Sequence, residues 1–126
     1  MAANDAWQNK RKHPRISWGF MIKFKQDGSD SGWEGVSTVR DISEGGCSFN
    51  TSCEYRVDQV LELEIKFPSL RDPMPLRGEV KRSTRGTGPN LFFVGVQFLK
   101  MDEPKRNELT GILDFFIKKS ERSKTS

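Results

Sequence analysis

ISWGFMIKF, residues 16–24, is the stretch that decides the fold. Its apolar side chains occupy every second position, which places them on one face of an extended strand. These side chains are Ile16, Trp18, Phe20, Ile22 and Phe24. Ser17, Gly19 and Lys23 stand between them and suit a face turned toward water. The pattern predicts a half-buried β-strand.

Five segments further along the chain have the same strand character. They are residues 34–42, 47–49, 60–67, 76–80 and 92–98. In the fourth strand, for example, Leu61, Leu63 and Ile65 alternate with Glu and Lys. Stretches rich in Gly, Pro, Asn, Asp and Ser separate the strands, as turns require. Six strands with short loops predict a small antiparallel barrel or sandwich.

The hydrophobic period changes at Pro104. The apolar residues that follow have the spacing of one helical face: Leu109, Ile112, Leu113, Phe116 and Ile117. We therefore expect a helix over 104–119, capped by Asp102 or Glu103, that covers an open face or end of the strands. Segment 120–126 has no core-forming residues and is predicted to be a disordered tail, and 1–9 a flexible N-terminus.

Length and composition limit the class of protein. A chain of 126 residues fits one domain, and its net charge of +4 favours an anionic partner. No apolar run approaches the roughly 20 residues of a membrane span, and the first residues lack a secretory core, so we expect no membrane insertion and a cytoplasmic location. Two cysteines and one histidine are too few for a zinc site, so no metal or cofactor is expected.

A basic run precedes the first strand. Arg11 and Arg15 are four residues apart, which is about 13 Å in an extended segment. The planar fork of arginine binds phosphate oxygens or the O6/N7 edge of guanine, and its face stacks on bases. A pair of this kind on its own is more often a solvated basic arm.

A polar turn follows the second strand. Asp41 and Ser43 project from the same face of an extended segment, and Gly45 and Gly46 follow after one further residue. Glycine allows a sharp turn or the close approach of a ligand. This corner is either an ordinary Asx or Ser turn or the rim of a polar ligand site.

The two motifs together resemble the PilZ domain, the bacterial receptor module for cyclic di-GMP. The resemblance rests on Arg11-x-x-x-Arg15, a following alternating strand, and Asp41-x-Ser43-x-x-Gly46, in that order. It extends from residue 10 to about residue 117. It implies a six-stranded antiparallel β-barrel with one C-terminal helix, in a domain over 10–119 whose residues 10–15 form a ligand-binding arm.

The resemblance also implies a role for each site residue. Arg11 and Arg15 would grip phosphates and guanines, and Lys10 would influence whether one ligand or a stacked pair is held. Asp41 would accept hydrogen bonds from a guanine edge. Ser43 would bind ligand or hold the turn, and Gly46 would let the backbone approach. Arg82 stands where some relatives carry a stacking aromatic; it either replaces that ring or is an exposed strand-end arginine.

The function that the resemblance implies is that of a cyclic di-GMP effector or adaptor. Binding would reorder the basic arm and signal through an unidentified protein that controls motility, pili or exopolysaccharide. Two alternatives stay open: a small barrel that binds single-stranded nucleic acid, and a PilZ-like interaction module without ligand. An enzyme is not expected, because His13 has no obvious nucleophile or carboxylate pair to work with.

Overall fold

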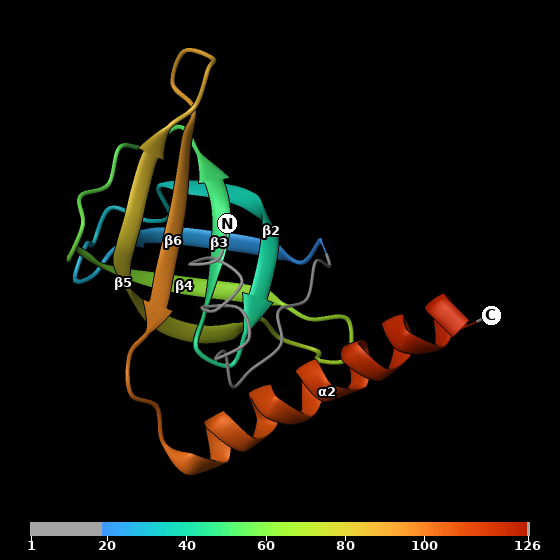
Figure 1. The fold of residues 1–126 in the computed structure, drawn as a ribbon. Coiled ribbons are helices and arrows are strands. Elements are labelled where there is room, and N and C mark those ends of the chain that lie inside the picture. Colours follow the sequence, from blue (N-terminus) through green and yellow to red (C-terminus); the bar gives the residue numbers. More distant parts are fainter. Residues whose placement is uncertain (1–18, 126) are drawn as a thin grey trace.

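The computed structural model describes residues 19–125, with side chains up to residue 119. It contains six strands and one helix (Figure 1): β1 (Met21–Gln26), β2 (Gly35–Ser43), β3 (Gly46–Thr51), β4 (Val60–Lys66), β5 (Met74–Arg85), β6 (Phe92–Phe98) and α2 (Glu103–Thr125). Neighbouring strands are all antiparallel and close a barrel in the order β1-β2-β3-β6-β5-β4. The predicted six-stranded barrel with a C-terminal helix is confirmed, and the sandwich alternative is wrong.

The first strand differs from its prediction in its limits. Ile22 and Phe24 point into the core as the alternation requires, and both are buried. The strand itself begins at Met21 and continues to Gln26, because the backbone pairs with β4 as far as Leu61. Phe20 is buried but precedes the strand, and residues 16–18 lie outside the described part of the chain.

Three aromatic rings close one end of the barrel. The pairing of Met21 with Lys66 places Phe20 and Phe67 side by side, with ring centroids 4.9 Å apart. Phe116 of α2 packs edge-on against Phe20 at 5.1 Å. The helix thus buries its apolar face against this end of the barrel, as predicted, and its C-terminal part extends past the strands (Figure 1).

The helix has a capped start and a later end than predicted. Asp102 Oδ1 accepts a hydrogen bond from the Lys105 N–H at 3.2 Å, so Asp102 is the cap. The end lies at Thr125 rather than Lys119, and the tail predicted over 120–126 is corrected to that extent. The sequence after Lys119 contains no Pro or Gly to stop the helix. The domain limits of 10–119 remain a prediction.

Strands β3 and β5 are longer than their apolar patterns indicate. The third strand, expected to end at Phe49, continues through Asn50 and Thr51, because both residues pair with β6. In β5 the register shifts between Val80 and Arg82, and β2 has a similar shift. Such β-bulges add one residue to a strand and interrupt the alternation of its side chains. The alternation therefore underestimates where these strands end.

Membrane spans and metal clusters are both absent from the described part of the chain. No helix within residues 19–125 combines the length and apolar character that a bilayer crossing needs. Over the same residues, no three metal-ligating side chains gather. Neither Cys47 nor Cys53 forms a disulfide, and Cys47 is buried as a small apolar side chain, as expected.

Candidate functional site

The polar corner predicted from the sequence is the hairpin between β2 and β3. Ser43 pairs with Gly46, and Glu44 and Gly45 form the turn between them. The Gly45 N–H donates to Ser43 Oγ at 3.3 Å. The Gly45 carbonyl accepts from the Phe98 N–H at 2.8 Å, which ties the turn to the end of β6. The predicted strand-to-turn transition is therefore confirmed, with Ser43 as its hydrogen-bonding side chain.

Gly46 has a structural reason to be glycine. A Cβ atom at this position would overlap the backbone carbonyl oxygen of Val96 in the neighbouring strand. The close approach that glycine permits here is that of β6. Its predicted role toward a ligand remains a prediction.

Four residues from four strands form one row across the outside of the barrel, which we call the Asp41–Arg82 row. Asp41 pairs with Ser48, Ser48 with Gly95, and Gly95 with Arg82. These strands lie side by side in the order β2, β3, β6 and β5 (Figure 1). At the usual strand spacing, the row is about 14 Å long. Two predicted site residues far apart in sequence, Asp41 and Arg82, thus belong to one surface.

A β-bulge lies at each end of the row. Val39 and Ile42 are both buried although three residues apart, which leaves Arg40 beside Asp41 on the outer face. On β5, Lys81 is likewise added beside the outer end of the row. The three-residue spacing of Val39 and Ile42 is a signal in the sequence that the alternation rule overlooked. The bulges therefore double the number of side chains that each end of the row presents.

Arg82 is exposed and lies along β6. A Cβ atom built on Gly95 would be 3.8 Å from Arg82 Nε and Nη2, so the guanidinium extends over that glycine. No carboxylate among residues 19–125 pairs with Arg82, whereas its neighbour Lys81 is 3.4 Å from Glu79. Arg82 therefore carries an un-neutralised charge within the described face.

Sequence reasoning missed three further residues on this face. The Arg40 guanidinium carbon lies 5.1 Å from the ring centroid of Phe93 on β6. Asn50 on β3 pairs directly with Phe93, and its buried Oδ1 has no hydrogen-bond partner within the described chain. The alternation of β6 indicates the outward position of Phe93, because Phe92 and Val94 point inward.

The basic arm, with Lys10, Arg11 and Arg15, lies outside the described residues. The described chain begins beside the corner, however. The Phe20 carbonyl accepts a 2.7 Å hydrogen bond from the Val39 N–H, two residues before Asp41. The arm is therefore joined to the barrel next to β2.

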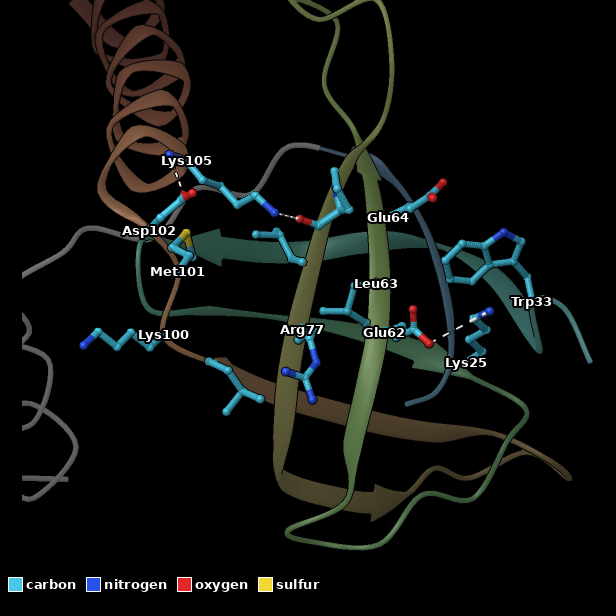
Figure 2. A pocket seen from close by; sticks show the side chains of 13 residues that line it. Lys25, Trp33, Glu62, Leu63, Glu64, Arg77, Lys100, Met101, Asp102 and Lys105 are labelled. Atoms are coloured by element: carbon cyan, nitrogen blue, oxygen red, sulfur yellow. Dashed lines mark hydrogen bonds and ion pairs between the residues drawn. The ribbon is translucent and has the colours of Figure 1, made fainter. Parts of the chain in front are cut away.

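A separate hollow of about 560 Å³ lies on other strands (Figure 2). Its walls come from β1, β4, β5, the loop with Trp33, the segment that leads into α2 and the first turn of that helix. The residues that line it are Lys25, Trp33, Glu62, Leu63, Glu64, Pro75, Leu76, Arg77, Leu99, Lys100, Met101, Asp102 and Lys105. None of the predicted site residues is among them.

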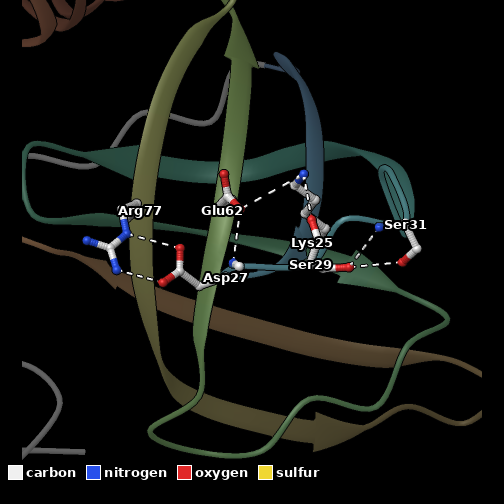
Figure 3. Close-up of polar contacts among 7 residues, drawn as sticks. Lys25, Asp27, Ser29, Ser31, Glu62 and Arg77 are labelled. Atoms are coloured by element: carbon white, nitrogen blue, oxygen red, sulfur yellow. Dashed lines mark hydrogen bonds and ion pairs between the residues drawn. The ribbon is translucent and has the colours of Figure 1, made fainter.

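Most charges around this hollow have partners within the fold. Arg77 holds Asp27 through two hydrogen bonds of 3.2 and 2.7 Å, and Lys25 lies 3.9 Å from Glu62 (Figure 3). The pKa of Arg77 is raised by its hydrogen bonds to Asp27. Such exposed pairs stabilise weakly but neutralise the surface. The Asp41–Arg82 row is the better candidate for a charged ligand.

Comparison with known proteins agrees with the motifs. The family model described as the PilZ domain matches residues 9–115. No curated protein matches the sequence significantly. The fold is similar to that of several solved structures, among them proteins of Bacillus subtilis, K. pneumonia and Escherichia coli.

Three of these structures show how far the likeness extends. The Bacillus subtilis inhibitor of motility (MotI/DgrA) has a TM-score of 0.68 and 13% identity over 90% of this chain and 52% of its own. The K. pneumonia MrkH–c-di-GMP complex has a TM-score of 0.71 and 19% identity, over 90% of this chain and 55% of its own. The PilZ domain of Escherichia coli YcgR with c-di-GMP has a TM-score of 0.65 and 11% identity, over 93% of this chain and 98% of its own. The chain spans about half the length of MotI and MrkH, and at these identities the likeness concerns the fold.

Proposed function

Because the chain belongs to the PilZ domain family, we propose that it is a receptor for cyclic di-GMP. The MrkH and YcgR domains that share its fold were solved with that ligand. The observation that carries the proposal is the Asp41–Arg82 row, which joins both described ends of the predicted site on one outward face.

The row has the chemistry that a guanine nucleotide needs. Asp41 accepts hydrogen bonds from guanine N–H groups, and the Arg82 guanidinium stacks on a base or binds a phosphate. Ser43 holds the turn through its bond with Gly45, so its contribution is to position the corner. Gly46 has no Cβ atom and so lets β3 pair closely with β6. The outer surface on which the ligand would lie therefore stays regular.

The basic arm completes the site. Four residues lie between Arg15 and Phe20, which gives a reach of about 17 Å, while Val39 beside Phe20 is about 7 Å from Asp41. Chain length therefore allows Arg15 to meet the row. Lys10 and Arg11 precede Arg15 in the same basic arm.

We propose that ligand binding orders the arm and that this ordering is the signal. The charges of Lys10, Arg11, Lys12 and Arg15 repel one another, and a dianionic ligand offsets that repulsion while it links the arm to the barrel. The ordered arm then presents a new surface to a downstream protein. MotI, described as an inhibitor of motility, makes motility one candidate process, beside pili and exopolysaccharide.

A nucleic-acid-binding barrel is the main alternative. Such proteins stack bases on exposed aromatic rings. Four aromatic rings of the described chain, Phe20, Phe24, Phe92 and Phe98, are buried and so are not offered for such stacking. Their burial favours the cyclic dinucleotide. The proposed activity is binding without catalysis, because the residues of the site supply hydrogen bonds, charge and stacking.

Isothermal titration with cyclic di-GMP tests the proposal. We expect wild type to bind, and Arg15→Ala and Asp41→Ala each to lose at least about tenfold in affinity, because both remove charged contacts. Glu64→Ala is the matched control, since Glu64 is a half-buried acid on β4, away from the row. Single-stranded DNA is titrated in parallel at rising salt. The proposal fails if wild type ignores cyclic di-GMP or if it binds DNA with a steep salt slope instead.

A further inference from the structure

Arg40 lies over a ring on the barrel surface and has no carboxylate partner among the described residues. It is the bulged residue of β2, and its guanidinium lies 5.1 Å from the ring centroid of Phe93 on β6. Strand β3 lies between β2 and β6, so the Arg40 side chain crosses β3 to reach that ring. A cation–π contact with an aromatic face restrains the guanidinium while its N–H donors stay available.

The strand that Arg40 crosses carries an unbonded acceptor. Asn50 is the β3 residue opposite Phe93, and its buried Oδ1 has no hydrogen-bond partner within residues 19–125. Buried polar atoms are usually paired, because loss of water without a replacement bond costs free energy. A free acceptor beside an arginine with free donors is typical of a surface that a ligand completes.

We propose that Arg40 and Phe93 form a second stacking element of the cyclic dinucleotide site, with Asn50 as an acceptor for a base edge. The inference rests on the proposed function. One guanine meets the Asp41–Arg82 row, and the other stacks on the Arg40 guanidinium, whose opposite face Phe93 supports. The N–H donors of that guanine match the free Oδ1 of Asn50.

Phe93 reduces the entropic cost of this contact. A free arginine side chain loses much rotamer freedom when it binds, whereas a guanidinium already held on a ring loses less. Removing either member of the pair should therefore weaken binding, Arg40 by loss of the stacking plane and Phe93 by loss of its support.

The chain offers a matched control for the pair. The Arg85 guanidinium lies 5.3 Å from the ring centroid of Phe92, a similar contact between the last residue of β5 and the first of β6. Phe92 points into the core, so Arg85 lies over a buried ring. Arg85→Ala thus removes one surface cation–π contact without touching the row.

The experiment is calorimetric titration of cyclic di-GMP into wild type and four variants. We expect Arg40→Ala and Phe93→Leu to weaken binding about tenfold, and Arg85→Ala to match wild type. Arg40→Lys should bind as weakly as Arg40→Ala, because an ammonium keeps the charge but lacks the stacking plane. Thermal unfolding of each variant is recorded to confirm that the fold is intact.

The outcomes separate this inference from the proposed function. If wild type binds and Arg40→Ala and Phe93→Leu bind equally well, the stacking element is rejected while the receptor proposal stands. Wild-type affinity in Arg40→Lys would show that only charge matters, which also rejects stacking. No binding by wild type would overturn both.

Discussion

Gly46 illustrates at the residue scale that one position can belong to a binding motif and still be determined by packing. The glycine lies at the start of β3, where the β6 backbone leaves no room for a Cβ atom. At its neighbour Gly45, in the turn itself, an added Cβ atom would meet only Ser43 Oγ, at 4.0 Å. The two adjacent glycines of this motif are therefore under different constraints: strand packing requires a glycine at position 46, whereas the space around position 45 would admit a side chain.

These two glycines give a paired prediction. Gly46→Ala should lower the free energy of unfolding by about 1–3 kcal/mol, because the barrel must open locally to admit the methyl group. Gly45→Ala should leave stability nearly unchanged. Urea denaturation of both variants measures the difference. Equal stability of the two would mean that β6 does not constrain Gly46.

Helix α2 acts at the element scale as a plug for one end of the barrel. Its buried face is formed by Leu109, Ile112, Leu113 and Phe116. Asp102 caps its first turn, and Lys105 Nζ donates to the Pro75 carbonyl at 2.8 Å, so the helix start is also tied to β5. The helix is therefore part of the core, and the proposed ligand site lies on the outer face of β2, β3, β6 and β5.

Adjacent phenylalanines of α2 test this role. Phe116 is 4% exposed and contacts Phe20, whereas Phe115 is 57% exposed. Phe116→Ala should cost about 3–5 kcal/mol of stability, since it leaves a cavity beside the Phe20 ring. Phe115→Ala should change stability by about 0.5 kcal/mol or less. Chemical denaturation compares the two, and similar losses would argue against the plug.

The whole molecule is a barrel closed at both ends. The end away from α2 is filled by Tyr55, whose ring meets Phe24 edge-on at 6.1 Å while Phe24 stacks on Phe49. The Tyr55 hydroxyl donates to Glu34 Oε1 at 2.7 Å and so connects two loops. Burial raises the pKa of Tyr55 far above its usual 10.0, and the hydrogen bond to Glu34 adds to this shift.

Stability should consequently fall in strong alkali. Below about pH 10 the phenol is neutral in both the folded and the unfolded chain, so its full contribution to the free energy of unfolding is present. Above about pH 10 only the unfolded chain loses the proton, and rising pH therefore favours unfolding. Because Tyr55 is the only tyrosine, phenolate absorbance reports it directly. We expect that signal to appear together with unfolding, and Tyr55→Phe to have a shallower pH dependence. A phenolate signal near the ordinary tyrosine pKa in the folded protein would contradict this.

Much of the fold was predictable because its signals are local. Period-2 alternation in Ile22 and Phe24, and helical spacing from Leu109 to Phe116, both report which side chains leave water. The bulges at Arg40 and Lys81 were not predicted, since a bulge depends on how two strands are paired and not on either strand alone.

The sequence by itself determined that this chain is a PilZ-type barrel with a polar corner at Asp41 and Ser43, because alternation, turn chemistry and motif order are properties of neighbours along the chain. Only the tertiary structure decided that Arg82 lies in one row with Asp41 and that Arg40 rests on Phe93. Strand register brings these residues together although they are far apart in the sequence. Register is settled by how the whole barrel buries its inner face, so no short stretch of sequence contains it.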